Sequence, residues 1–342
     1  MSSDELFMLR TIELARNGAG KVSQNPLVGC VITHENIIVG EGWHQQYGEA
    51  HAEVNAINAV IDHSILKDCT VYVSLEPCSH TGKTPPCADL LVRHQVKRVV
   101  VAIQDPNPLV SGSGIAKLKS AGIEVVVGVL EKEGRVLNKR FLTFIEKKRP
   151  YIILKWAQTS DGFIARENFD SKWISNESSR QLVHRWRAEE DAILVGYNTA
   201  LHDNPHLTVR DWSGKNPLRI VIDKELKLDP ANNIFDAAAP TICYNMMKQD
   251  KQSNLEWVKL NDSKIIEQII AHLYKRKIQS LIVEGGAQTI NSFLSAGLWD
   301  EARVFISSDK FEKGIKAPEL KTGYAKQEWI GDDALKIFVN NS

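Results

Sequence analysis

Three short segments in the first half of the chain carry residue types that together bind zinc. His51 and Glu53 belong to a His-Ala-Glu segment, Cys78 follows a proline, and Cys87 comes nine positions later. A catalytic zinc ion takes three protein ligands and leaves a fourth position to water, whose pKa it lowers to about 7. One imidazole and two thiolates fit that count. Glu53 would lie about 200° around a helix from His51, so it is better suited to carry protons beside the metal.

The spacing of the two cysteines leaves alternatives open. Eight residues, SHTGKTPP, separate Cys78 from Cys87, whereas the zinc deaminase pattern H-x-E followed by P-C-x-x-C has two. In one alternative, both cysteines are small buried hydrophobic residues and His51 caps a helix. In another, zinc is structural and has a fourth ligand, for which His80 is the nearest candidate. The remaining cysteines lack such neighbours, and core packing is predicted for Cys30, Cys69 and Cys243.

The second half lacks a metal motif, and its informative residues lie near the ends of predicted strands. Lys155 and Asp161 mark the first strand, the segment 196–199 follows another, and Glu284 precedes a Gly-Gly pair and a helix. Ligands of α/β sheets bind outside the carboxyl ends of the strands. A Gly-Gly pair there lets a phosphate or ribose approach the helix N-terminus. Taken alone, such a pair is more often an ordinary turn.

The elements that position these residues follow from the apolar pattern. In the first half, strands are predicted at 27–33, 37–42, 70–76, 96–103 and 123–130, and helices at 52–63, after Pro86, at 114–121 and at 131–147. Pro150 ends the last helix, and we place a domain boundary there. In the second half, strands are predicted at 151–158, 191–195, 218–222, 240–244, 279–284 and 301–307, helices at 176–189, 262–276 and 286–296, and a surface loop at 246–253. This alternation predicts mostly parallel sheets with helices on their faces.

Length and composition restrict the class of protein. The 342 residues suggest two domains. Lysine and arginine total 42 and aspartate and glutamate total 42, so the formal charge is zero and no basic nucleic-acid footprint is present. Hydrophobic residues at 43% and charged residues at 25% exclude disorder, collagen and coiled coil. The acidic start and the lack of any run of 18 apolar residues predict a cytoplasmic protein without a signal peptide or a membrane span.

Longer motifs run through nearly the whole chain. In the first half they are NPLVG at 25–29, HAEVNA at 51–56, LEPCSHTGKTPPC at 75–87 and QDPNPLVSGSG at 104–114. In the second half they are LKWAQTSDG at 154–162, SKWIS at 171–175, DNPHLTVR at 203–210 and VEGGAQT at 283–289. Together they resemble the family of bifunctional riboflavin-biosynthesis pyrimidine deaminases/reductases, whose pattern includes the long loop between the cysteines. The resemblance implies an α/β protein with a cytidine-deaminase-like three-layer α/β/α domain over 1–149 and a dihydrofolate-reductase-like α/β domain over 150–342.

For the N-terminal domain, the resemblance implies zinc-dependent hydrolytic deamination of 2,5-diamino-6-ribosylamino-4(3H)-pyrimidinone 5′-phosphate. His51, Cys78 and Cys87 would hold the zinc, and Glu53 would move the proton. Substrate contacts are implied by family position for Asn25, His44, Lys83, Thr84, Asp105 and Asn107, with Lys83 and Thr84 on the phosphate. We interpret the G-x-G at 112–114 as a turn beside the substrate, because a lone G-x-G is weak evidence for a dinucleotide loop.

For the C-terminal domain, the resemblance implies NADPH-dependent reduction of the ribosyl group to ribityl. The implied substrate contacts are Lys155, Ser171, Arg187, Leu207, Arg210 and Glu284. The implied NADPH contacts are Ala157, Trp173, Thr199, Asp203, Gly286, Ala287, Gln288, Thr289 and Ile290. Asp203 is the best placed acid near the reacting sugar, and both arginines suit a phosphate. The segment 166–169 departs from the small, glycine-containing stretch that the family has before SKWI.

Two other classes of function stay open on the sequence alone. One is a nucleic-acid or nucleotide deaminase fused to an accessory domain, and the other is a non-enzymatic protein with structural zinc. Neutral charge and a loop suited to a single phosphate argue against a polynucleotide. We therefore expect a small-molecule substrate and no nucleic-acid or membrane partner. The resemblance also makes a homodimer or homotetramer reasonable, with the reductase half as the contact.

Overall fold

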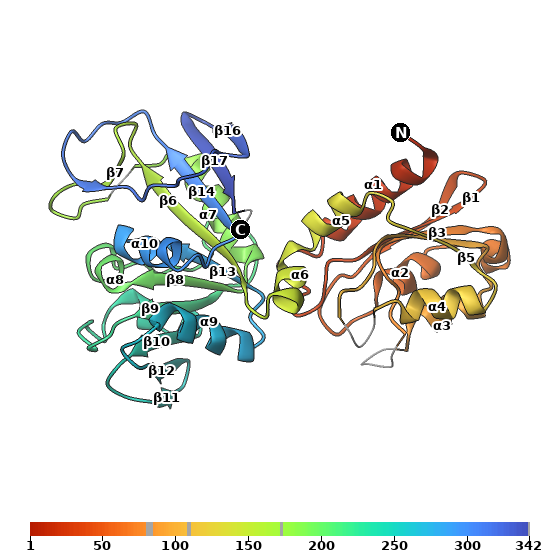
Figure 1. The fold of residues 1–342 in the computed structure, drawn as a ribbon, viewed down its shortest axis with the longest axis horizontal. Coiled ribbons are helices and arrows are strands. Elements are labelled where there is room, and N and C mark those ends of the chain that lie inside the picture. Colours follow the sequence, from red (N-terminus) through yellow and green to blue (C-terminus); the bar gives the residue numbers. More distant parts are fainter. Residues whose placement is uncertain (80–84, 108–110, 172–173, 341–342) are drawn as a thin grey trace. The chain divides into compact units, whose positions relative to one another are not determined.

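The chain forms two compact units, Met1–Lys148 and Arg149–Ser342, in a computed structural model that describes residues 1–79, 85–107, 111–171 and 174–340. The division lies one residue before the boundary predicted from the sequence. Each unit has its own sheet and its own apolar core (Figure 1).

The N-terminal unit is built around a mixed sheet. Its elements are α1 (Ser3–Arg16), β1 (Gly29–His34), β2 (Ile37–Trp43), α2 (Ala52–Asn58), the 3-10 helix η1 (His63–Asp68), β3 (Thr70–Leu75), α3 (Cys87–Arg93), β4 (Arg98–Ile103), α4 (Ser113–Ser120), β5 (Glu124–Val127), α5 (Glu131–Leu137) and α6 (Lys139–Glu146). The strand order is β2-β1-β3-β4-β5. β1 is antiparallel to β2 and β3, whereas β3, β4 and β5 are parallel. The prediction of a mostly parallel sheet therefore holds for one side of it.

Helices cover both faces of this sheet (Figure 1). Val31 packs in a core with residues of α1 and α6 such as Met8, and its neighbour Ile32 packs with residues of α2 and α3 such as Leu91. Successive side chains of a strand point to opposite faces, so one short strand contributes to both cores. The predicted three-layer α/β/α architecture is confirmed.

Three details of this unit differ from the prediction. Helix α1 was not predicted, although its N-terminus has a capping box in which Ser2 and Glu5 exchange hydrogen bonds. The helix predicted at 52–63 ends at Asn58, and η1 follows it. The single helix predicted at 131–147 is two helices that meet at Asn138.

The C-terminal unit contains a longer sheet. Its elements are β6 (Tyr151–Gln158), β7 (Phe163–Ala165), α7 (Glu177–Glu189), β8 (Ala192–Gly196), α8 (Tyr197–Asp203), β9 (Leu218–Ile222), the 3-10 helix η2 (Asn233–Phe235), β10 (Thr241–Asn245), β11 (Asp250–Gln252), β12 (Leu255–Lys259), α9 (Ile265–Lys275), β13 (Ser280–Glu284), α10 (Ala287–Ser295), β14 (Glu301–Ile306), β15 (Ile315–Lys316), β16 (Lys326–Ile330) and β17 (Asp333–Val339). The strand order is β11-β12-β10-β9-β8-β13-β6-β14-β17-β16, and β7 pairs with β15. The strands from β12 to β14 in this order are parallel, and those beyond them at either end are antiparallel.

Apolar residues again fill both faces of the C-terminal sheet. One core holds Leu194 together with residues of α9 and α10, such as Phe293. The other holds Ile193 with residues of α7 and α8, such as Val183 and Ala200. This packing leaves the carboxyl ends of β6, β8 and β13 side by side in the sheet, where α8 and α10 begin. Among the residues that the structure describes, no helix is long and apolar enough to cross a membrane.

The C-terminal unit contains several elements that were not predicted, among them α8, β7, β12 and β15. The predicted loop at 246–253 contains β11, which forms an antiparallel pair with β12. The last two strands, β16 and β17, were not predicted, and their hairpin turns at Gly331 with φ +58°. A glycine adopts this left-handed conformation at little cost.

Candidate active sites

His51, Cys78 and Cys87 meet at one end of the N-terminal sheet. His51 is the N-cap of α2, Cys78 follows β3, and Cys87 is the first residue of α3. His51 Nδ1 lies 3.6 Å from Cys78 Sγ and 3.3 Å from Cys87 Sγ. The three possible ligand atoms lie within 4.8 Å of one another. One imidazole nitrogen and two sulfurs at this separation fit a zinc ion with an open fourth position.

The three groups stabilise a thiolate before any metal binds. The pKa of Cys78 is lowered to about 4, first because the Cys87 thiol donates to it and also because it accepts from His51 and the Cys87 main chain. The pKa of Cys87 is raised by this same donation and by burial. The pKa of His51 is raised by its contact with Cys78. A metal ion would displace the protons that these side chains share, so binding releases protons.

Glu53 lies beside the ligands in the first turn of α2. Its side chain is buried, and burial, followed by the nearby Cys78 thiolate, raises the pKa of the carboxyl group. A carboxyl group with a raised pKa is suited to take up and release a proton near neutral pH. Within the described part of the chain, the ligand cluster consists of His51, Cys78 and Cys87. His80, the alternative fourth ligand, lies outside the described residues.

A cavity of about 380 Å³ adjoins these residues. Asn25, His44, Asp105 and Asn107 line it together with His51 and Glu53. Asn25 Nδ2 lies 3.0 Å from His44 Nε2, and His44 Nδ1 lies 3.0 Å from the Ala50 carbonyl oxygen. Burial lowers the pKa of His44, so its ring is neutral, donates from Nδ1 and accepts at Nε2. Lys83 and Thr84 lie outside the described residues.

Glu76 is a structural residue of this site that the sequence analysis did not single out. Its buried carboxylate accepts hydrogen bonds from main-chain N–H groups in the loop before α4 and in its first turn, those of Asp105, Gly112, Gly114 and Ile115. Glu76 therefore connects this loop to the end of β3, two residues before Cys78. A Cβ on Gly114 would lie 2.0 Å from the Pro77 carbonyl oxygen, so the close approach requires glycine. An acidic residue directly after an apolar strand was the available signal.

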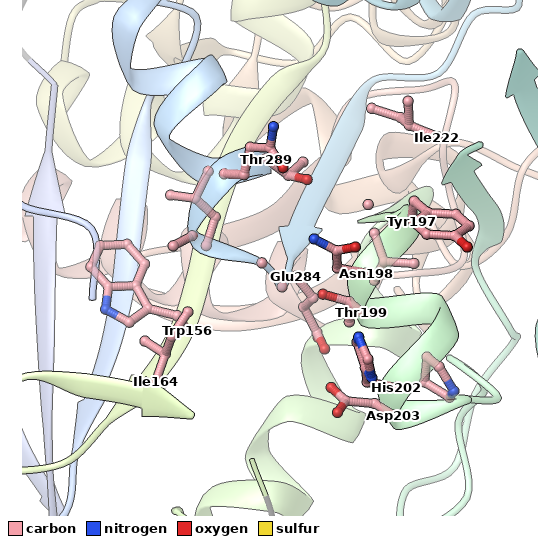
Figure 2. A pocket seen from close by; sticks show the side chains of 18 of the residues that line it. Trp156, Ile164, Tyr197, Asn198, Thr199, His202, Asp203, Ile222, Glu284 and Thr289 are labelled. Atoms are coloured by element: carbon pink, nitrogen blue, oxygen red, sulfur yellow. The ribbon is translucent and has the colours of Figure 1, made fainter. Parts of the chain in front are cut away.

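A second cavity, of about 1370 Å³, lies in the C-terminal unit. Figure 2 shows Glu284 at the end of β13, with Thr199, His202 and Asp203 of α8 beside it. The predicted reductase residues that line this cavity are Lys155, Ala157, Ser171, Arg187, Thr199, Asp203, Leu207, Arg210, Glu284, Gly286, Ala287, Gln288, Thr289 and Ile290. The structure therefore brings them together, and their individual roles stay predictions. Trp173 lies outside the described residues.

Glu284 is the centre of a buried charge cluster. Arg187 Nη2 lies 2.7 Å from Glu284 Oε2, and Arg187 Nε lies 3.3 Å from Oε1. Burial opposes ionisation of Glu284, but Arg187 and Lys155 outweigh it and lower its pKa to about 2. Burial, together with Arg187, lowers the pKa of Lys155. Glu284 of β13 and Lys155 of β6 are paired in the register of these two strands, which explains why both side chains reach the same cavity.

Helix α8 contacts the segment before α7 at two neighbouring positions. The Ser171 hydroxyl donates to Asp203 Oδ1 at 3.0 Å. The Phe169 ring stacks on His202 with centroids 4.3 Å apart and an interplanar angle of 2°. The segment that departs from the family pattern is thus held against α8 by an aromatic stack at the cavity. Phe169 has φ +67°, a left-handed backbone conformation that is energetically unfavourable for a residue with a large side chain.

Close backbone packing beside α10 forms a cradle that fits NADPH. A Cβ on Gly285 would lie 2.7 Å from the Thr199 side chain, and a Cβ on Gly196 would lie 2.2 Å from Thr289 Oγ1. Gly285 and Gly286 both have positive φ. Gly285 and Gly286 line the cavity at the start of α10, and the main-chain N–H groups of a helix N-terminus bind phosphate.

Comparisons with known proteins match both units. Residues 1–103 match the cytidine and deoxycytidylate deaminase zinc-binding region, and residues 150–309 match the RibD C-terminal domain. The chain is 41% identical over 350 residues to riboflavin biosynthesis protein RibD of Aquifex aeolicus, covering 98% of both chains. It is 43% identical to RibD of Bacillus amyloliquefaciens, covering 94% of this chain and 88% of that one.

A solved structure matches the whole chain. It is a diaminohydroxyphosphoribosylaminopyrimidine deaminase/5-amino-6-(5-phosphoribosylamino)uracil reductase from Thermotoga maritima, 38% identical, with a TM-score of 0.91 and coverage of 98% of both chains. Fold and sites thus define a two-domain enzyme that joins a zinc-dependent deaminase of the cytidine deaminase class to an NADPH-dependent reductase. The chain belongs to the RibD family of bifunctional riboflavin biosynthesis enzymes.

Proposed function

We propose that the N-terminal unit deaminates 2,5-diamino-6-ribosylamino-4(3H)-pyrimidinone 5′-phosphate and that the C-terminal unit then reduces its ribosyl group to ribityl. The observation that carries this proposal is the presence, on one chain, of two cavities lined by residues suited to these two reactions. One contains a zinc ligand set beside a buried glutamate, and the other contains a buried acid flanked by two cations and a glycine cradle.

In the deamination, water replaces the amino group on a ring carbon, and ammonia leaves. Zinc held by His51, Cys78 and Cys87 would act as a Lewis acid that makes water nucleophilic near neutral pH. Glu53 moves the first proton of the attacking water to the ring nitrogen, and it moves the second proton, from the resulting hydroxyl group, to the amino group that leaves as ammonia. The raised pKa of Glu53 supports this role, because burial favours the protonated form that must later donate a proton.

Asn25, His44, Asp105 and Asn107 orient the pyrimidine. Neutral His44 and Asn25 present a fixed donor and acceptor arrangement at the cavity, because each restrains the other through their 3.0 Å contact. Lys83 and Thr84 remain the predicted phosphate ligands of this site. A single phosphate is the anion to which such a pair is suited.

In the reduction, the ring-opened ribosyl carbon gains a hydride and the neighbouring atom gains a proton. The N-terminus of α10, with Thr199 and Thr289, would hold NADPH, which would supply the hydride when bound. Lys155 and Glu284 orient the sugar hydroxyl groups from the strand ends. Asp203, fixed by the Ser171 hydroxyl, is the proposed proton-handling group at the sugar.

Arg187 and Arg210, two of the arginines that line the cavity, have different proposed roles. Arg210 is the proposed phosphate ligand, because the guanidinium group of Arg187 already binds Glu284. Arg210 is exposed, and its guanidinium lies 3.4 Å from the Thr208 hydroxyl. Arg187 instead keeps Glu284 ionised.

We further propose a cytoplasmic enzyme that assembles as a homodimer or homotetramer through the reductase unit. Membership in the family supports this, and sedimentation of the purified chain tests it. A monomer at working concentration would contradict the assembly.

The experiment that tests the proposed function follows ammonia release and NADPH oxidation together on the purified, zinc-loaded chain. With the diaminopyrimidinone ribosyl phosphate as substrate, ammonia should appear first and NADPH oxidation should lag behind it. Ammonia without NADPH oxidation would refute the second step, and absence of both would refute the proposed substrate.

A further inference from the structure

Helix α6 forms part of the wall of the deaminase cavity. Phe141 and Ile145 of this helix line the same cavity as Asn25 and Glu53. Both lie beyond residue 103, where the match to the general deaminase zinc-binding region ends. The zinc ligands and Glu53 therefore lie within the region matched to that broad class of deaminases, whereas the α6 wall lies outside it.

Asn138 fixes the start of α6 against the loop that carries Asn25. Its Oδ1 accepts from the Leu27 N–H at 2.8 Å, and its Nδ2 donates to the Leu27 carbonyl oxygen at 2.9 Å. Asn138 is 2% exposed and stands where α5 ends and α6 begins. The Asn138 amide thus pairs with both main-chain groups of Leu27, as a neighbouring strand would. An aspartate at this position would offer no donor for the Leu27 carbonyl oxygen.

This pairing connects the helix break to the polar side of the cavity. Leu27 is two residues from Asn25, and Asn25 contacts His44. A shift of the Leu27 main chain would therefore move the Asn25 amide relative to His44. Small displacements of orienting groups change catalytic efficiency strongly even when they are far from the reacting atoms.

We propose that α6 is a substrate-recognition element of the deaminase, in which Phe141 and Ile145 pack on the flat face of the pyrimidine and Asn138 acts as a positioning residue. A planar heterocycle has polar edges and apolar faces, so it needs both kinds of wall. Asn25, His44 and Glu53 supply polar groups, and α6 supplies an aromatic ring and a branched aliphatic side chain. This inference rests on the proposed pyrimidine substrate.

The test measures deamination kinetics of Ile145→Ala and Asn138→Asp in the full-length, zinc-loaded chain. Ile145 is preferred to Phe141 for truncation because Phe141 is a buried member of the apolar core, whereas Ile145 is only partly buried against it. The matched control is Val136→Ala on α5, since Val136 is 66% exposed and lies outside the cavity lining. Zinc content reports whether the N-terminal unit of each variant is folded, and reduction of the deaminated uracil compound reports on the C-terminal unit.

For Ile145→Ala, KM for deamination should rise about tenfold with little change in kcat, because a hydrophobic contact to bound substrate is lost. For Asn138→Asp, kcat/KM should fall by up to about a hundredfold. In both variants, zinc content and the reductase rate should match those of the wild type. The Val136→Ala control should have wild-type kinetics.

Unchanged KM in Ile145→Ala, with an active wild type, would overturn the recognition role of α6. A parallel loss of deamination and of bound zinc in Asn138→Asp would overturn its positioning role in favour of a purely structural one. Absence of ammonia release by the wild type would instead refute the proposed substrate, so the two failures are distinguishable.

Discussion

Replacing Glu284 by glutamine should strongly destabilise the C-terminal unit. The carboxylate is buried between Arg187 and Lys155, which lower its pKa from 4.5 to about 2. Each pH unit between these values corresponds to about 1.4 kcal/mol, so the ionised Glu284 contributes about 3 kcal/mol at neutral pH. Removing one partner of a buried ion pair typically costs about 3–5 kcal/mol, which agrees with this value.

The pH dependence of this effect has a definite sign. Because the pKa of Glu284 is lower in the folded chain, its stabilisation is present above pH 4.5 and is lost as the pH falls toward 2. The difference in free energy of unfolding between the wild type and Glu284→Gln should therefore be about 3 kcal/mol at pH 7 and should shrink between pH 4.5 and pH 2.

Urea unfolding followed by tryptophan fluorescence measures this difference. Seven of the eight tryptophans lie after residue 150, so the signal reports mainly on the C-terminal unit. The control is Glu328→Gln, which removes a surface pair with Lys326 and should change stability by less than about 1 kcal/mol. A Glu284→Gln effect as small as that of the control, or one that does not change with pH, would refute the reasoning.

Two further substitutions test how the cavities are supported. Gly114→Ala should weaken zinc binding about 10–100-fold in a chelator competition, because its methyl group would displace the Pro77 carbonyl next to a zinc ligand; zinc affinity equal to the wild type would contradict this. Arg219→Met should lower the free energy of unfolding by about 3–5 kcal/mol, since the fully buried guanidinium donates to the carboxylate of Asp236 and to the carbonyl of His206, beside the NADPH cavity. A rise in KM for NADPH should accompany this loss of stability. Wild-type stability of the variant in urea would argue against a structural role of Arg219.

The zinc site was predictable because its residues are chemically distinctive. A histidine, a glutamate and two cysteines in a set order restrict the chemistry even before the fold is known. The structure then places the three ligand atoms within 4.8 Å. The reductase residues were harder to find, because lysine, arginine and glycine near strand ends are common, and family resemblance was needed to select them.

The supporting residues could not be predicted in the same way. Asn138 acts through Leu27, 111 positions away in the sequence, and Glu76 acts through main-chain groups of a later loop. Both contacts depend on how distant segments pack, which no local pattern reports. The break between α5 and α6 was also missed, because the predicted helix is amphipathic on both sides of Asn138 and its local pattern shows no interruption. Helix α1, in contrast, had a visible signal in its Ser-x-x-Glu capping box.

The most direct test of the central claim is a Glu53→Gln variant assayed with two substrates. With the diaminopyrimidinone ribosyl phosphate, the variant should retain zinc, release no ammonia and oxidise no NADPH. With the deaminated uracil compound, it should oxidise NADPH at the wild-type rate. Ammonia release by the variant, or failure to use the deaminated compound, would contradict an enzyme in which Glu53 serves the first of two separate and successive reactions.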